Sequence, residues 1–233
     1  MEHKSCNIGI TETGDPCFDF SWCKKLQEAN IIITKGLNDR IIKELIKHKD
    51  KIILHLTCTG NGGTALEPNV PKPQELQGQL EKLISMGFNI NQVVLRVDPI
   101  ILNTEFCMNA FVPVELFKHN IKRLRFSFLN MFSSCGARYN IKQDIGINEF
   151  SRTFIKEATR YYTLESCSGI KNNNVIKNAC ISETDMEILN KNIILYPNNR
   201  KRGNCNIPSN AIELLEKNNC KHGCKYCYLR GKI

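Results

Sequence analysis

Short runs of β-forming residues alternate with segments of helical periodicity along most of this chain, and this alternation constrains the fold more than any other feature. We predict strands over residues 6–11, 31–34, 51–56, 93–97, 124–128 and 193–196. We predict helices over residues 18–29, 38–48, 73–87, 113–119 and 150–161. Strands separated by helices are typical of βα units, which place their strands in a parallel sheet. The sequence therefore predicts an α/β fold.

Residues that begin and end helices support these boundaries. Asn38 or Asp39 is suited to cap the second predicted helix, and Pro73 stands at the favoured first position of the third. Ser182, with Asp185 three residues later, is a weak capping signal for one further short helix.

The size and composition of the chain indicate one large globular unit. Of its 233 residues, 42% are hydrophobic, which is sufficient for a substantial core. Within it we distinguish a βα core, residues 1–162, from an irregular cysteine-bearing segment, residues 163–233, that completes it. The sequence contains no run of about 18 apolar residues and begins without an apolar signal segment. We therefore expect a cytoplasmic protein in a reducing compartment, without a membrane partner.

The chain is basic, since Lys and Arg exceed Asp and Glu by 32 − 23 = 9 and the isoelectric point lies near 9.0. Such a balance is typical of proteins that contact nucleic acids. The excess consists largely of scattered lysines in a chain rich in Asn, Ile and Lys, as an AT-rich genome would encode. A solvated basic surface is therefore the alternative. The basic run Arg200–Arg202 is the candidate for a nucleic-acid contact.

Three cysteines near the end of the chain form the most specific chemical motif. Cys220, Cys224 and Cys227 have the spacing C-x-x-x-C-x-x-C, and Tyr226 and Tyr228 flank the third of them. Three thiolates on a short loop can hold a 4Fe–4S cluster and leave one iron open to another ligand. The alternatives are thiols without a metal, or zinc held by the three cysteines with His222 or a distant fourth ligand, although His222 lies awkwardly between them on a tight loop.

Other cysteines provide a second candidate metal site. The chain has 12 cysteines, which in a reducing compartment favours metal ligands or small buried residues over disulfides. Cys167, Cys180 and Cys205 precede the terminal motif at wide spacing. They are candidates for an auxiliary iron–sulfur cluster or a zinc ion, and small core residues are the alternative.

Polar residues follow several predicted strands, where function collects in parallel α/β folds. Thr11–Pro16 contains a Gly14-Asp15-Pro16 turn, and residues 57–64 form a glycine-rich loop whose backbone could approach a ligand. Arg96 and Asp98 share one face of a strand end, where they would bind a carboxylate or ribose or form a structural ion pair.

The strand predicted at 124–128 has two faces of opposite character. Arg123, Arg125 and Ser127 alternate with apolar Leu124, Phe126 and Phe128. One face therefore belongs to the core, and the other faces either a barrel lumen or solvent.

The terminal motif closely resembles that of the radical S-adenosylmethionine (SAM) enzymes in spacing and aromatic placement. In that superfamily the open iron binds the amino and carboxylate groups of SAM, and an electron from the cluster cleaves SAM to a deoxyadenosyl radical. The segment Thr13–Pro16 resembles the Gly-Gly-Glu-Pro-like segment that meets the SAM amino group there. The resemblance implies a TIM-like, partly open parallel βα barrel. It also implies that Gly14 and Asp15 contact SAM and that Tyr226 shields the cluster.

The chain also resembles a widespread bacterial and viral family of domain-of-unknown-function proteins. The resemblance is carried by Leu66–Pro71 (Leu-Glu-Pro-Asn-Val-Pro), Leu95–Ile101 (Leu-Arg-Val-Asp-Pro-Ile-Ile) and the C-x-x-His-Gly-C-x-Tyr-C-Tyr tail, in this order. Members tend to carry cysteines where Cys167, Cys180 and Cys205 stand. The motif order differs from that of typical radical SAM enzymes, where the cysteines follow the first strand. This order suggests a circularly permuted barrel.

These resemblances imply a radical SAM enzyme that uses a 4Fe–4S cluster, SAM and an external electron donor to abstract hydrogen from a substrate. The net charge favours a nucleic acid or nucleotide, as in DNA repair or base modification. In this hypothesis Arg96 and Asp98 face SAM or substrate. The alternatives are a non-catalytic nucleic-acid-binding protein stabilised by zinc or an iron–sulfur cluster, and a binder that uses the basic run Arg200–Arg202 alone.

Overall fold

The computed structural model describes residues 6–129, 144–166, 170, 172–197, 207–216 and 219–227. Its centre is an eight-stranded sheet in which every pairing is parallel, in the order β7-β6-β5-β4-β3-β2-β1-β8. The strands are β1 (Ile8–Ile10), β2 (Ala29–Thr34), β3 (Ile52–Thr57), β4 (Val93–Ile100), β5 (Arg123–Phe128), β6 (Thr163–Ser166), β7 (Val175–Lys177) and β8 (Ala211–Glu213). The predicted α/β fold with a parallel sheet is confirmed.

Helices connect most of these strands. They are α1 (Asp39–Lys47), α2 (Pro73–Ser85), α3 (Phe111–Phe117), α5 (Ile147–Ala158) and α6 (Glu183–Ile188), with short 3₁₀ turns η1 (Ser21–Lys24), η2 (Lys49–Lys51), η3 (Ile90–Gln92) and η4 (Cys107–Ala110). The predicted caps are confirmed, because Asn38 accepts hydrogen bonds from the first turn of α1, and Ser182 and Asp185 form a capping box on α6.

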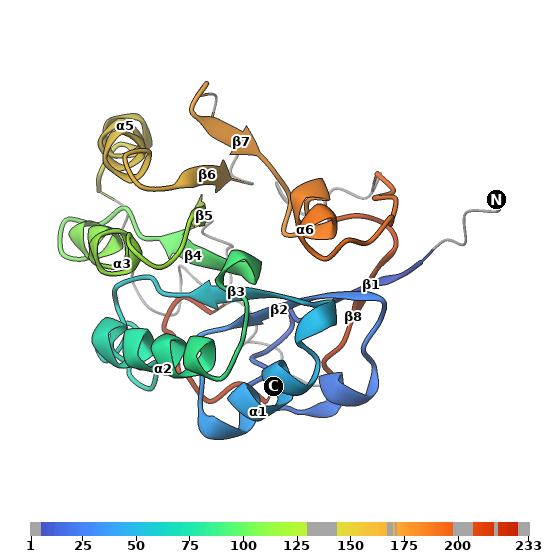
Figure 1. Ribbon diagram of the computed structural model, residues 1–233. Coiled ribbons are helices and arrows are strands. Elements are labelled where there is room, and N and C mark those ends of the chain that lie inside the picture. The colour runs from blue at the N-terminus through green and yellow to red at the C-terminus, as the bar shows by residue number, and fades with distance from the viewer. Residues whose placement is uncertain are drawn as a thin grey trace.

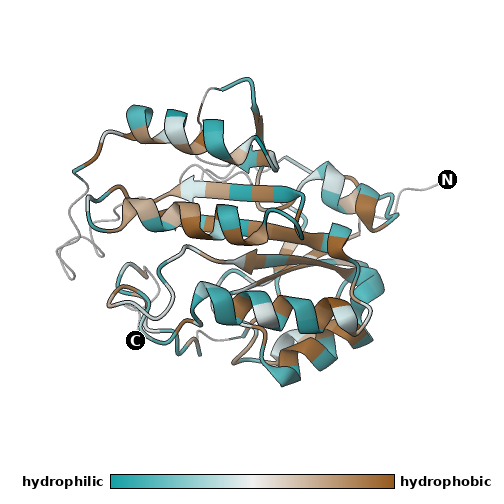
Figure 2. Ribbon diagram, turned by 60° about the vertical axis from the view of Figure 1, so that its left-hand side comes forward, coloured by the Kyte–Doolittle hydropathy of each residue, from teal (hydrophilic) through white to brown (hydrophobic). Residues whose placement is uncertain are grey.

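The larger hydrophobic core lies between the sheet and four helices. Figure 1 shows α1, α2, α3 and α5 along one side of the strands and α6 on the other. Each of the four presents an apolar stripe, for example Leu76, Leu80 and Leu83 of α2, all fully buried. The alternation of brown and teal around the helices in Figure 2 reflects this division.

The other face of the sheet holds a smaller core. Side chains such as Ile31, Ile53 and Val94 pack there with Met186 and Leu189 from α6 and the residue that follows it. Strand β5 shows the alternation between the faces, because Leu124 belongs to the helix-covered core. The polar residues beside it lie on the second face and are buried, which excludes the solvent-facing alternative for Arg123 and Arg125.

Two local predictions were wrong. Residues 18–29 form only the turn η1 before β2 begins at Ala29. Side chains divert the backbone there, since Asn30 Oδ1 accepts from Gln27 N at 2.8 Å and Gln27 Nε2 donates to Lys25 O at 2.6 Å. Such bonds compete with helix formation. Residues 193–196 form no strand.

Residues after 162 extend the same sheet. Strands β6 and β7 continue it beyond β5, and β8 pairs with β1 at the opposite edge. The sheet therefore crosses the predicted boundary between residues 162 and 163. Over the ranges that the structure describes, no helix has the length and apolar character needed to cross a membrane.

Candidate functional site

A cavity of about 290 Å³ opens at the carboxyl ends of the central strands. Residues of five neighbouring strand ends and of the cysteine loop, residues 220–227, line it together. They include Glu12, Gly14, Asp15, Lys35, Thr57, Arg96, Asp98, Ser127, Cys220, His222, Cys224, Tyr226 and Cys227. Segments more than 200 residues apart in sequence thus meet at the position where parallel α/β folds usually bind ligands.

The backbone of the cysteine loop is held by the turn that contains the Leu-Glu-Pro-Asn motif. Lys225 N donates to Leu66 O at 2.9 Å, and Asn69 N donates to His222 O at 3.1 Å. The side chain of Asn69 donates to Lys221 O at 2.9 Å. These bonds fix both halves of the loop without using a thiol.

A buried charged network also anchors the loop. The fully buried Glu67 accepts hydrogen bonds from Lys35 Nζ at 2.6 Å, from Thr59 Oγ1 at 2.7 Å and from the hydroxyl of Tyr226. Lys35 Nζ also lies 3.0 Å from Tyr226 Oη. Burial would raise the pKa of Glu67, but the charge of Lys35 and the hydrogen bonds from Lys35, Tyr226 and Thr59 together hold the pKa below its ordinary value. Glu67 is therefore a buried carboxylate that orients Tyr226.

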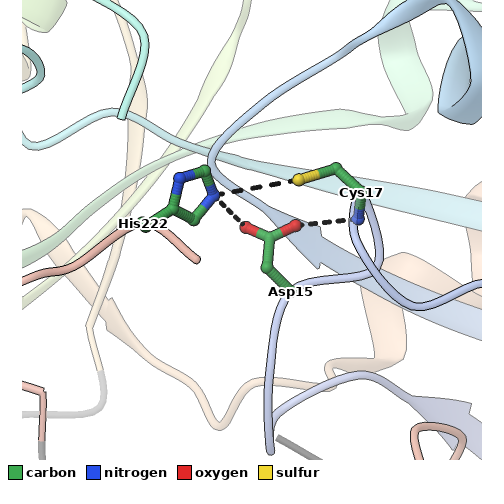
Figure 3. Close-up of side chains that lie close together, drawn as sticks. All are labelled: Asp15, Cys17 and His222. Carbon is green, nitrogen blue, oxygen red and sulfur yellow. Dashed lines mark hydrogen bonds and ion pairs between the residues drawn. The ribbon is translucent and has the colours of Figure 1, made fainter. Parts of the chain in front are cut away.

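A second anchor joins the loop to the segment after β1 (Figure 3). His222 Nε2 lies 2.8 Å from Asp15 Oδ2 and 3.8 Å from the Sγ of Cys17. Asp15 also accepts hydrogen bonds from Cys17 N, Thr34 Oγ1 and Lys35 N, at 3.0, 2.6 and 2.8 Å. Burial would raise the pKa of Asp15, but the bonds from His222 and Thr34 keep it below its ordinary value.

The carboxylate of Asp15 therefore accepts four hydrogen bonds, which is the full capacity of its oxygens. It would have to exchange one of them to meet an amino group of a ligand. Gly14, which also borders the cavity, precedes it at the same strand end.

The three loop cysteines lie close together in weakly polar surroundings. Cys224 and Tyr226 pack with Leu66, Ile101 and Leu129 in a small apolar cluster, and Cys227 borders it. Burial is the main cause that raises the pKa of Cys220 to about 12 and of Cys224 to about 11, and the neighbouring loop thiols contribute. The three thiols are therefore neighbours, and all three residues border the cavity.

Arg96 and Asp98 form an ion pair on the cavity wall. Arg96 Nε donates to Asp98 Oδ2 at 2.6 Å, and Ser127 Oγ donates to the other oxygen of that carboxylate. The structural ion pair is thus present, yet Arg96 Nη1 is buried without a hydrogen-bond partner among the described residues. Arg96, Asp98 and Ser127 all border the cavity.

Glu12 brings a second kind of acid to the cavity. Burial, followed by the neighbouring Cys180, raises the pKa of Glu12 to about 9, so the carboxyl group is protonated at neutral pH. Its backbone N–H donates to Glu213 Oε2 at 2.9 Å, which ties the end of β1 to β8. Glu12 can therefore donate a hydrogen bond to a ligand.

Deeper in the sheet, polar side chains form a closed network. Arg123 donates to Glu165 and Asp185 at 2.8 Å each, and Arg125 donates to Glu165 and to Cys180 O. All five residues are buried. Asp185 lies in α6, so this network joins the helix to the polar side chains of β5.

The structure brings most of the predicted site residues to one cavity: Gly14, Asp15, Arg96, Asp98, Cys220, Cys224, Tyr226 and Cys227. Cys180 is buried beside Glu12. Cys167, Cys205, Tyr228 and residues 200–202 lie outside the described residues, so the auxiliary site and the basic run stay predictions.

Sequence reasoning missed four contributors: Glu12, Cys17, Lys35 and Glu67. Glu12 and Lys35 directly follow buried strands, the same signal that identified Arg96 and Asp98. Glu67 lies in the Leu-Glu-Pro-Asn motif, whose pattern gave no role for its carboxylate.

The glycine-rich loop packs against protein backbone. A Cβ on Gly60, whose φ is +83°, would lie 1.8 Å from Asn109 O, and one on Gly62 would lie 2.0 Å from Pro71 O. Neither glycine borders the cavity. The close contacts with backbone oxygens explain why these two positions carry glycine. Of this loop, residues 57–64, only Thr57 lines the cavity.

A family model described as Domain of unknown function (DUF1848) matches residues 26–229. The chain belongs to this family. The match includes the strands from β2 onward and the cysteine loop, and it confirms the predicted membership of a domain-of-unknown-function family. No curated protein and no solved structure matches the chain.

Proposed function

We propose that this member of the DUF1848 family is a radical SAM enzyme. The observation that carries the proposal is the meeting of the three loop cysteines with the strand-end cavity. A 4Fe–4S cluster held there would supply the electron that cleaves SAM and so produces the radical that abstracts hydrogen from the substrate. An external electron donor would be required.

The donor set fits such a cluster. Cys220, Cys224 and Cys227 offer three neighbouring thiols, and the apolar cluster around Cys224 excludes water from one side of them. The cavity borders all three, so an iron without a protein ligand would face it. Lys35 favours the thiolate of Cys224, since its charge lowers the pKa that burial raises.

Strand order supports a permuted barrel. The cysteine loop follows β8, and β8 pairs in parallel with β1, whose end carries Gly14 and Asp15. In typical radical SAM enzymes the cysteines follow the first strand. The adjacency of β8 and β1 gives the same neighbourhood with the chain order changed.

The other cavity residues receive roles in this proposal. The backbone of Gly14, and Asp15 after exchange of one hydrogen bond, would meet the amino group of SAM. Arg96 and Asp98 would bind polar groups of SAM or substrate, with the free Nη1 of Arg96 as donor. Tyr226, fixed by Glu67, would cover the cluster. The net charge of +9 supports a nucleic acid or nucleotide as substrate, and binding that weakens steeply with salt would support this class.

The test is anaerobic reconstitution with iron and sulfide, followed by iron counting and EPR of the reduced protein with and without SAM. We expect four irons per chain, an EPR signal that SAM shifts, and loss of both in Cys224→Ala with the circular dichroism unchanged. Cys107→Ala, a buried cysteine in the helix-covered core, is the matched control and should retain the cluster. A cluster indifferent to SAM, or a colourless protein with zinc on the loop cysteines, would overturn the proposal.

A further inference from the structure

Three metal-ligand side chains of different chemistry meet beside the cysteine loop (Figure 3). Asp15, Cys17 and His222 each offer a ligand atom, and these atoms lie within 4.8 Å of one another. The residues are 4%, 5% and 2% exposed. We propose that this group binds a single zinc ion, at a site whose ligands are distinct from the three cluster cysteines.

The orientation of the imidazole suits a metal ligand. His222 Nδ1 lies 3.2 Å from Asn69 O, which can only accept, so Nδ1 carries a hydrogen. Metal-bound histidines commonly donate their other N–H to a backbone carbonyl in this way. Nε2 then points toward Asp15 Oδ2 and the Sγ of Cys17.

The charges balance when zinc replaces protons. Zinc would form one bond each to Nε2, to a carboxylate oxygen and to sulfur. Any proton on Nε2 and the thiol proton of Cys17 would pass to solvent. Zn²⁺ with one carboxylate, one thiolate and a neutral imidazole has net charge zero, so binding buries no unpaired charge.

The surroundings hold the three ligands in place. Thr34 Oγ1 and the backbone N–H of Cys17 donate to the second oxygen of Asp15, and Asn38 Nδ2 donates to Cys17 O at 3.1 Å. The ring of Phe18 packs edge-on against His222, with centroids 4.8 Å apart. Two zinc ligands at roughly 2.0 Å in tetrahedral geometry lie roughly 3.3 Å apart. The 2.8 Å between Nε2 and Oδ2 must therefore widen by about half an ångström.

The donor types favour zinc over harder cations. One sulfur, one imidazole nitrogen and one carboxylate oxygen match its borderline softness. Three protein ligands would leave a fourth position, and because Asp15 and His222 line the cavity, water or a substrate atom would fill it. With Asp15 on zinc, the backbone of Gly14 would be the remaining protein contact for an amino group at this strand end.

The first measurement is zinc content and zinc X-ray absorption of the full-length protein, as purified and after cluster reconstitution. We expect one zinc per chain with one sulfur ligand, in addition to any iron. More than one sulfur per zinc would place the ion on the cysteine loop and overturn the inference, and so would the absence of zinc. Iron content and zinc content are separate readouts, so failure of the cluster proposal leaves this result interpretable.

Variants assign the site with cobalt as the probe. Cys220→Ser, Cys224→Ser and Cys227→Ser together leave Cys17 as the thiol of the three-residue group, and this protein should bind one Co²⁺ with a thiolate charge-transfer band. Adding Cys17→Ser should remove the band, whereas adding Cys107→Ser should not. A band that survives Cys17→Ser would refute the assignment. If the triple variant does not fold, as judged by circular dichroism, Cys17→Ser alone must still lower the zinc content of the otherwise unaltered chain.

Discussion

Truncation of Glu67 tests whether the buried network fixes the cysteine loop. Its carboxylate is fully buried and accepts hydrogen bonds from Lys35, Thr59 and Tyr226. Glu67→Ala removes these acceptors while the ammonium group of Lys35 stays beside the cavity. The hydroxyl of Tyr226 then loses its acceptor and keeps the contact with Lys35 Nζ at 3.0 Å.

The expected cost follows from burial. Removing one partner of a buried ion pair costs roughly 3–5 kcal/mol. Lys35 retains 16% side-chain exposure, so water from the cavity can partly solvate it and the lower end of that range applies. The lost acceptor of Tyr226 adds about 1 kcal/mol. We expect the free energy of unfolding to fall by about 4 kcal/mol, which in a chain of this size lowers Tm by roughly 8–16 °C.

Urea unfolding monitored by circular dichroism measures this change. Glu67→Gln, which keeps an oxygen acceptor but loses the charge, should fall between wild type and Glu67→Ala. Asp39→Ala is the control, because Asp39 and Lys82 form a pair at 2.7 Å whose side chains are 77% and 52% exposed. The control should unfold at the same urea concentration as wild type. If Glu67→Ala also does so, the network does not hold the loop and the reasoning fails.

Two further predictions concern the scaffold. Gly60→Ala should lower the free energy of unfolding by at least about 2 kcal/mol, because φ is +83° and the new Cβ would overlap Asn109 O. Gly78→Ala in α2, where the new Cβ would have nothing within 4 Å, should raise the free energy of unfolding by about 1 kcal/mol. Urea midpoints measure both changes, and equal shifts in the two variants would contradict the argument. Glu165 should make the free energy of unfolding depend on pH in the acid range. Burial would raise its pKa, but two guanidinium groups hold it below 4.5, so its stabilisation is present above that pH and is lost as the pH falls through the folded value. The unfolding free energy should therefore decline more steeply below pH 4.5 in wild type than in Glu165→Gln, and parallel curves would exclude this contribution.

Local pattern was sufficient for the sheet and for much of the cavity wall. The alternation around Leu124 separated a core face from a polar face because side chains of a strand alternate with a period of two. Arg96 and Asp98 were predicted to share one face of a strand end, where function collects in parallel α/β folds. The same rule applied to Glu12 and Lys35 would have found them.

Local pattern failed where particular side-chain contacts, near or distant in sequence, decide the structure. Residues 18–29 have helical spacing, but the side chain of Asn30 bonds the backbone of Gln27 and β2 begins early. Glu67 and Tyr226 are 159 positions apart, and Asp15 and His222 are 207 apart. Such pairings depend on which strand ends adjoin in the folded sheet.

Several of the contacts that position the cysteine loop are made by groups other than its thiols. They run from Glu67 to Tyr226, from Asp15 to His222 and between backbone groups at Leu66 and Asn69. These contacts would remain without the thiolate ligands of a cluster, whereas small domains that fold around their ion lose their structure without it. It follows that loss of Cys224 should abolish the cluster and spare the fold, whereas loss of Glu67 should weaken both. A protein whose fold collapsed with Cys224→Ala would instead use its metal as a structural element.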